Sequence, residues 1–290
     1  MEINKKIKTL EFKLSKILNW WLFWAYKSRF SGNWMEFDEH KEYDFWDSLK
    51  DIDWKASSKT WIIYSKKYEE QRDLSVLFVL DNSKTMSFGS QNKTKKETLE
   101  EIFYSLALSA YYNNDNIWWF VFNEKELNII DYQKTRENIY KILDVLEWNS
   151  KTLKVELENN NEKVNKILDY LIKNKTKNNL IFLLTDNVES ISEKKLRLIS
   201  SLNDLIIINI FDVFENELFD FDTDISLKDD NNFINISLNK NKSEKYKLIR
   251  KNSIKLLKEI CIKNSIWYIY IDNNSDVFFE LMKYFNWIKK

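Results

Sequence analysis

The residues of this chain best placed to do chemistry follow a short, mostly apolar run. Asp81, Ser83 and Thr85 come directly after residues 74–80, whose length and composition predict a buried parallel strand. Open α/β sheets bind their ligands beyond the carboxyl ends of such strands. A carboxylate followed by two hydroxyls at alternate positions supplies hard oxygen ligands of the kind that Mg²⁺ prefers. The spacing therefore predicts a cation site at this edge of a sheet.

Two further residues complete the predicted metal site. Asp186 follows a second apolar run, residues 180–184, so its carboxylate can reach the same edge as Asp81. Thr152 lies in a predicted loop between two helices and adds a third hydroxyl. Mg²⁺ takes about six oxygen ligands. Mn²⁺ and Ca²⁺ are alternative ions for such a site. The five predicted protein ligands are Asp81, Ser83, Thr85, Thr152 and Asp186. They leave a coordination position for water or for an acidic group of a partner.

A regular alternation of strands and helices must position these residues. The apolar pattern predicts strands at residues 117–122, 126–130, 180–184, 205–210 and 266–271, and helices at residues 93–112, 134–146, 162–174, 192–202, 242–262 and 276–285. Alternation of this kind is typical of an α/β fold with a doubly wound, mostly parallel sheet. Residues 1–70 read as a helical and extended appendage, and residues 71–290 as the main domain.

Composition narrows the classes of function. Acidic and basic residues number 45 each, so the zero net charge does not favour nucleic acid as a partner. A single Cys261 and a single His40 exclude a disulfide framework and a Cys/His zinc cluster. The apolar stretch at residues 17–26 is shorter than the roughly 20 residues of a transmembrane helix. A cytoplasmic protein without a transmembrane segment is expected, with an interfacial helix at residues 17–26 as the alternative. The spacing of apolar residues also predicts an amphipathic helix at residues 4–23.

The motifs resemble those of a known family. Asp81-x-Ser83-x-Thr85, with Thr152 and Asp186, resembles the metal-ion-dependent adhesion site of von Willebrand factor type A domains, although Thr85 replaces the usual second Ser. The sequence upstream of Asp81 is similar to the signature of the domain of unknown function 58 family. An Ile-Asp-Trp block is the most specific part of that signature. That block is Ile52-Asp53-Trp54, and Lys41, Lys50 and Lys59 stand where the family has arginines.

The resemblance implies a protein without enzymatic activity that works beside a MoxR-type AAA+ ATPase. Members of this kind act in the assembly or metal-loading of other protein complexes. The resemblance thus supports a metal-dependent protein-interaction domain with a MoxR-type ATPase and a client protein as partners.

Two other readings of Asp81 stay open. Asp, Ser and Thr after a strand are also ordinary turn and helix-capping residues. A haloacid dehalogenase-like phosphotransferase also places a nucleophilic Asp after its first parallel strand, in the pattern Asp-x-Asp-x-Thr. Here Ser83 occupies the position of the second acid and cannot serve as general acid, which disfavours that enzyme.

The tryptophan content suggests a further hypothesis about the gene. The chain has 12 Trp but only 2 Gly and no Pro, and several Trp stand in turn-like contexts that suit glycine. These are Trp34, Trp46, Trp61 and Trp148. Since some bacteria read the codon UGA as glycine, we predict UGA codons at several Trp positions, and the alternative is a naturally Trp-rich core. UGG codons at all of these positions would refute the hypothesis.

Overall fold

The computed structural model describes most of the chain beyond residue 34. The described residues are 35–44, 52–60, 62–70, 75–113, 115–123, 126–130, 153–156, 163–188, 191–217, 223–229, 232–238 and 240–287. No helix among them is long and apolar enough to cross a membrane. The predicted helices at residues 4–23 and 134–146 lie outside these ranges.

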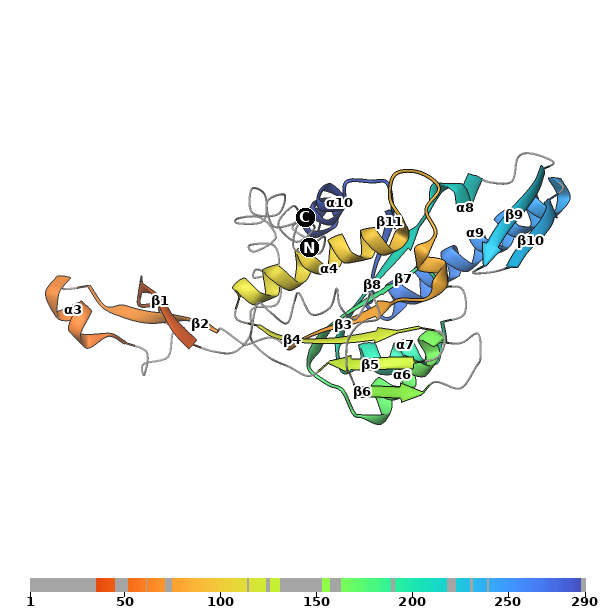
Figure 1. Cartoon of the computed structure of the whole chain (residues 1–290). Coiled ribbons are helices and arrows are strands. Elements are labelled where there is room, and N and C mark those ends of the chain that lie inside the picture. The colour runs from red at the N-terminus through yellow and green to blue at the C-terminus, as the bar shows by residue number, and fades with distance from the viewer. Residues whose placement is uncertain are drawn as a thin grey trace, which may run out of the picture.

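A sheet of seven described strands forms the centre of the molecule (Figure 1). Its order is β11-β8-β7-β3-β4-β5-β6. The first five strands in this order pair in parallel, and β5 and β6 add an antiparallel edge. Their bounds are Ser75–Asp81 for β3, Asn116–Phe122 for β4, Glu126–Ile130 for β5, Leu153–Glu156 for β6, Asn179–Thr185 for β7, Asp204–Phe211 for β8 and Trp267–Asp272 for β11.

Helices cover both faces of this sheet because its central strands are apolar on both sides. In β3, residues 76–81 are all buried; Val76, Phe78 and Leu80 belong to one core cluster and Leu77 and Val79 to the other. The first cluster includes residues of α4 (Lys95–Tyr112) and α10 (Val277–Trp287), and the second those of α6 (Lys163–Lys173), α7 (Glu193–Ser200) and α9 (Lys240–Lys263). The predicted doubly wound α/β fold is therefore confirmed.

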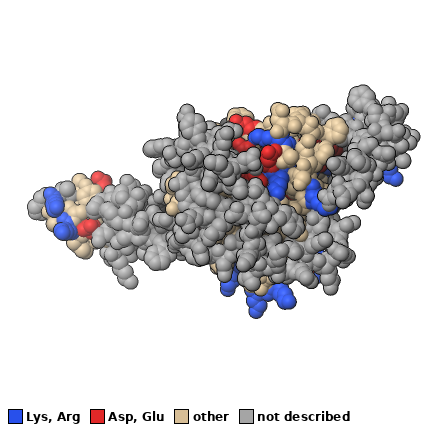
Figure 2. Space-filling model, viewed as in Figure 1, with Lys and Arg blue, Asp and Glu red and all other residues tan. Residues whose placement is uncertain are grey.

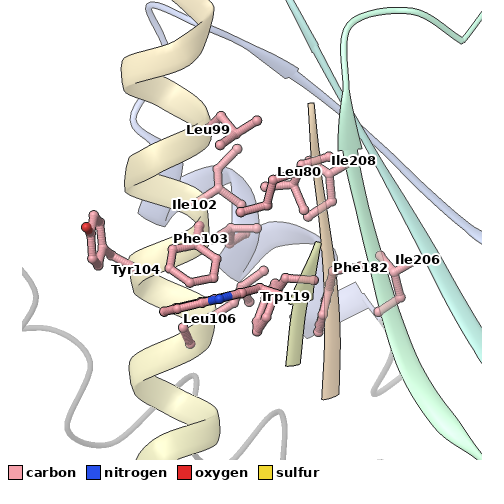
Figure 3. Packing of buried hydrophobic residues seen from close by; sticks show 14 of the residues in the cluster. Leu80, Leu99, Ile102, Phe103, Tyr104, Leu106, Trp119, Phe182, Ile206 and Ile208 are labelled. Carbon is pink, nitrogen blue, oxygen red and sulfur yellow. The ribbon is translucent and has the colours of Figure 1, made fainter. Parts of the chain in front are cut away.

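Aromatic rings fill the core between α4 and the sheet. Phe78 on β3 stacks against Phe182 on the neighbouring β7, with ring centroids 5.2 Å apart. Phe103 of α4 meets Phe78 edge-on at 5.0 Å, and Trp119 of β4 lies 5.5 Å from Phe103. Figure 3 shows Leu99, Ile102 and the rings of Phe103, Trp119 and Phe182 between α4 and the strands. This packing holds α4 against β3, β4 and β7.

Two smaller antiparallel pairs stand apart from the main sheet. β1 (Met35–Glu42) pairs with β2 (Tyr64–Glu70), with the short α3 (Trp54–Thr60) between them in sequence. β9 (Thr223–Asp229) and β10 (Asn232–Leu238) form the second antiparallel pair. Figure 1 draws these two pairs at opposite ends of the molecule. The predicted boundary between residues 1–70 and 71–290 stays a prediction.

One local prediction needs correction. The stretch predicted as a loop between two helices contains the edge strand β6, which starts at Leu153. The sequence missed it because four residues with two charges carry little strand signal. In the Ile-Asp-Trp block, Trp54 is 69% exposed. The neighbouring Asp53 caps α3, because its Oδ1 accepts the backbone N–H groups of Lys55 and Ala56.

Candidate functional site

The predicted carboxylates lie where the winding of the sheet reverses. After β3 the chain moves to β4 on one side, and it later returns to β7 on the other side of β3. Ligands of doubly wound sheets bind at the carboxyl ends of the two strands that flank such a reversal. Asp81 is the last residue of β3, and Asp186 follows the last residue of β7. The tertiary structure thus brings together the two acids that the sequence proposed.

Asp81 is buried and held from two directions. Its Oδ1 accepts the backbone N–H of Ser83 at 2.9 Å, and its Oδ2 accepts the hydroxyl of Thr185 at 2.6 Å. Only 2% of the residue is exposed. Burial, together with the negative charge of nearby Asp186, raises the pKa of Asp81 from 3.8 to about 6, although these hydrogen bonds oppose the change. The ionised carboxylate is therefore costly unless a cation neutralises it.

The two hydroxyls of the motif face one another. The Oγ of Ser83 and the Oγ1 of Thr85 lie 2.9 Å apart. A 3₁₀ turn, η2 (Lys84–Ser87), produces this geometry, and its buried Met86 anchors the turn in the core. Ser83 is buried whereas Thr85 is exposed. The site therefore reaches the surface of the protein on the side of Thr85.

Asp186 has an internal counter-ion that the sequence reading did not anticipate. The Nζ of Lys95, at the first residue of α4, lies 2.7 Å from Oδ2 of Asp186, and the same ammonium also pairs with Glu215. Oδ1 of Asp186 is buried and has no hydrogen-bond partner among the described residues. Burial alone would lower the pKa of Lys95, but the two carboxylates outweigh it and raise that pKa above its ordinary value.

The ion pair continues outward to α9. Glu215 lies in α8 (Val213–Glu217), which follows β8. Its Oε2 accepts from Nη2 of Arg250 at 3.1 Å. A chain of alternating charges therefore leads from Asp186 through Lys95 and Glu215 to Arg250. This chain joins the predicted cation site to the surface of α9.

A second buried acid holds the loop that follows β3. Asp212 follows β8, and its Oδ2 accepts from the backbone N–H of Ser90 at 2.8 Å and from Nδ2 of Asn273 at 2.7 Å. Its Oδ1 accepts from the Ser90 hydroxyl and from the backbone N–H of Phe214. Burial alone would raise the pKa of Asp212, but these donors outweigh it and hold the pKa below its ordinary value. Asp212 therefore acts as an ionised structural clamp.

Gly89 lets the same loop close tightly. A Cβ at this position would lie 2.8 Å from Cα of Thr94 and closer still to the carbonyl oxygen of Lys93. Both contacts are with backbone, which cannot move aside as a flexible side chain does. Thr94 then caps α4, with its hydroxyl accepting the N–H of Glu97 at 3.1 Å. This loop sets where Lys95 enters the site.

The structure brings together four of the five predicted site residues: Asp81, Ser83, Thr85 and Asp186. Thr152 lies outside the described residues, next to the start of β6. The sequence analysis missed Thr185, Lys95 and Asp212. The strand-end rule could have found Thr185 and Asp212, because each stands at the end of a parallel strand. Nothing in the local sequence marks Lys95, which is a buried cation at the start of a helix.

The donors at this site suit a small hard cation. Two carboxylates and two hydroxyls are oxygen ligands of the type that Mg²⁺ takes. The Oδ1 of Asp186 has no hydrogen-bond partner among the described residues, and the pKa of Asp81 is raised; a bound cation would compensate both. Among the described residues, no three His, Cys, Asp or Glu side chains gather into a metal-binding cluster. The hydroxyls would thus have to supply part of the coordination.

Comparison with known proteins places the chain in a family. The model of the family described as "Protein of unknown function DUF58" matches residues 39–253, which is most of the chain. The chain belongs to the DUF58 family. The matched range of this DUF58 protein includes Asp81, Asp186 and Asp212. The resemblance seen in the upstream motifs is therefore confirmed.

Two solved structures that match the chain share little sequence identity with it. One is a conserved hypothetical protein, BatB, from Bacteroides thetaiotaomicron, with 12% identity, a TM-score of 0.45 and coverage of 74% of this chain and 98% of that chain. Another is an uncharacterised membrane-spanning protein from Vibrio fischeri, with 11% identity, a TM-score of 0.23 and the same coverage. No curated protein matches the chain.

Proposed function

We propose that this DUF58 protein is a non-enzymatic protein-interaction module that uses a divalent cation to bind an acidic group of a partner. Asp81, Ser83, Thr85 and Asp186 would hold the ion directly or through water, with Thr152 as a fifth ligand. Mg²⁺ is the proposed ion, and Mn²⁺ and Ca²⁺ are the alternatives. The cytoplasm is the expected compartment.

One observation carries the proposal: the buried carboxylates of Asp81 and Asp186 interact at the reversal point of the sheet. Two like charges so placed repel each other, and burial adds to their cost. Two buried carboxylates therefore destabilise the fold unless a positive charge lies close to them. The ammonium of Lys95 supplies part of that charge, but it reaches Oδ2 of Asp186 and leaves Oδ1 unpartnered among the described residues.

The exposure of Thr85 supports a role in binding rather than in structure alone. A purely structural cation would be enclosed, whereas this site opens at Thr85. A Mg²⁺ ion held there by only two carboxylates would keep positive character and an open coordination position for a carboxylate of another protein. Asp and Glu side chains of a partner are therefore the proposed ligands.

The proposed partner is a MoxR-type AAA+ ATPase acting with a client protein in the assembly or maturation of complexes. Family resemblance supports this assignment, and it is tested with the ATPase encoded in the same genome. The purified ATPase is captured on the immobilised full chain in Mg²⁺ and again in EDTA. Capture in Mg²⁺ that EDTA removes is the expected result.

Two variants and a matched control test the role of the site. Asp81→Ala should abolish the Mg²⁺-dependent rise in melting temperature and the capture of the ATPase. Thr85→Val changes an exposed hydroxyl, spares both carboxylates, and should weaken both effects without loss of the fold. Asp169→Ala removes an exposed carboxylate on α6 and should leave both effects intact.

Other outcomes would contradict the proposal. If Mg²⁺ shifts the melting temperature of Asp81→Ala as much as that of the wild type, the ion does not bind at Asp81. Phosphatase turnover that disappears in Asp81→Ala but persists in Asp169→Ala would instead identify the phosphotransferase with Asp81 as nucleophile.

A further inference from the structure

The exposed side of α9 forms a basic groove beside the predicted cation site. The groove has a volume of about 710 Å³, and its charged lining residues are Glu215, Lys247, Arg250, Lys251, Lys255 and Lys258. Five cations therefore face one carboxylate. Figure 2 shows Lys and Arg side chains on the viewed face near the place where Figure 1 draws α9. Such an excess of one charge is notable in a chain whose net charge is zero.

The spacing of the lysines sets what can fit. Lys247, Lys251 and Lys255 recur every four residues, so they lie on one face of α9 at intervals of about 6 Å. Alternate side chains of an extended peptide repeat at about 6.8 Å. An extended segment with Asp or Glu at every second position would therefore match the row of ammonium groups.

The groove already binds a carboxylate at one end. Glu215 lines the groove, and its Oε2 accepts a hydrogen bond from Nη2 of Arg250 at 3.1 Å. The same carboxylate pairs with Lys95, which pairs in turn with Asp186 of the predicted cation site. The groove and that site are thus only two ion pairs apart.

Two lysines of the groove are open to a ligand. Lys251 and Lys255 are exposed, and neither has an ion-pair partner among the described residues. Lys258 is less available, since its ammonium lies 5.9 Å from the ring centres of Tyr268 and Tyr270. The row Lys251–Lys255 is therefore the centre of the available surface.

We propose that the α9 groove binds an extended acidic segment of the same partner whose carboxylate reaches the cation site. The proposal rests on the proposed function, because it supplies a second contact for that partner. A protein segment is favoured over nucleic acid or an anionic membrane. The groove is concave, and its Arg250 is already paired with the carboxylate of Glu215. A partner carboxylate is therefore a better match for the groove than a phosphate. Two linked contacts would raise the affinity beyond that of either one.

The test titrates the full chain into a labelled peptide of about ten residues with Glu and Ser in alternation, first in EDTA and then in Mg²⁺. We expect binding in EDTA that Mg²⁺ strengthens. Lys251→Glu and Lys255→Glu should each weaken binding in EDTA by about threefold to tenfold, because attraction becomes repulsion at an exposed site. Lys245→Glu is the matched control, since Lys245 is exposed on α9 outside the groove.

The two proposals fail in different ways. If Lys251→Glu and Lys255→Glu bind the peptide as tightly as Lys245→Glu, the groove assignment is overturned. It is also overturned if single-stranded RNA of equal charge, or phosphatidylglycerol vesicles, bind through these lysines more tightly than the peptide. If the lysine effect stands but Mg²⁺ adds nothing, the groove is supported and the cation-dependent function is refuted.

Discussion

Removing the charge of Asp81 should stabilise the metal-free protein. Burial and Asp186 raise the pKa of Asp81 from 3.8 to about 6, so between these values the folded protein binds a proton that the unfolded chain releases. Stability then falls as the pH rises from about 4 to 6. At about 1.36 kcal/mol for each pH unit, the ionised side chain costs the fold about 3 kcal/mol above pH 7.

Asp81→Asn keeps the shape of the side chain and removes this cost. The amide oxygen can still accept the N–H of Ser83, and the hydroxyl of Thr185 can rotate to accept from the amide nitrogen. We therefore expect the variant to be more stable than the wild type by up to about 3 kcal/mol at pH 8 in EDTA, with the gain lost near pH 4. Urea unfolding followed by tryptophan fluorescence at both pH values measures it.

Asp212→Asn is the matched control because it removes an equally buried charge from the carboxyl end of β8 in the same sheet. The pKa of Asp212 is held below its ordinary value by four hydrogen bonds from Ser90, Asn273 and Phe214. This variant should therefore lose about 1–3 kcal/mol at pH 8. The reasoning is refuted if Asp81→Asn is also destabilised in EDTA, or if its gain is the same at pH 4 as at pH 8.

Three further predictions concern the same region. Mg²⁺ affinity should fall about tenfold for each pH unit below about 6, because protons compete with the cation at Asp81; calorimetry that shows equal affinity at pH 5 and 7.5 would contradict this. Lys95→Met should cost about 3–5 kcal/mol in EDTA, because Asp186 loses its counter-ion, and Mg²⁺ should then stabilise the variant more than it stabilises the wild type in thermal melts. Gly89→Ala should cost about 1–3 kcal/mol, because the new methyl group meets the backbone of Lys93 and Thr94; a chemical denaturation midpoint unchanged from the wild type would show that the loop has room.

The order of apolar runs was enough to predict most of the fold. Residues 74–80, 180–184 and 205–210 are nearly continuous in apolar side chains, and each forms a parallel strand buried on both faces. Such a run excludes a surface position whatever its partners, so the assignment needs no tertiary information. β6, β9 and β10 were missed, and the extended part of residues 1–70 was predicted without the bounds of β1 and β2, because short or charged strands on an edge have a weak local pattern. The helix predicted at residues 134–146 and the codon hypothesis for Trp remain predictions.

The candidate site divides in the same way. Asp81, Ser83, Thr85 and Asp186 could be named from the sequence, because each stands beside the end of an apolar run and parallel strands end at one edge of a sheet. Lys95 and Glu215 could not, and neither could the hydrogen-bond partners of Asp212. Lys95 forms ion pairs with Asp186 and Glu215, which are separated from it by 91 and 120 positions in the sequence. Asp212 accepts hydrogen bonds from Ser90, which is 122 positions away. Such partners meet only once the strand order is set and the loop at Gly89 has closed, so the charges around the site were decided by the tertiary structure alone.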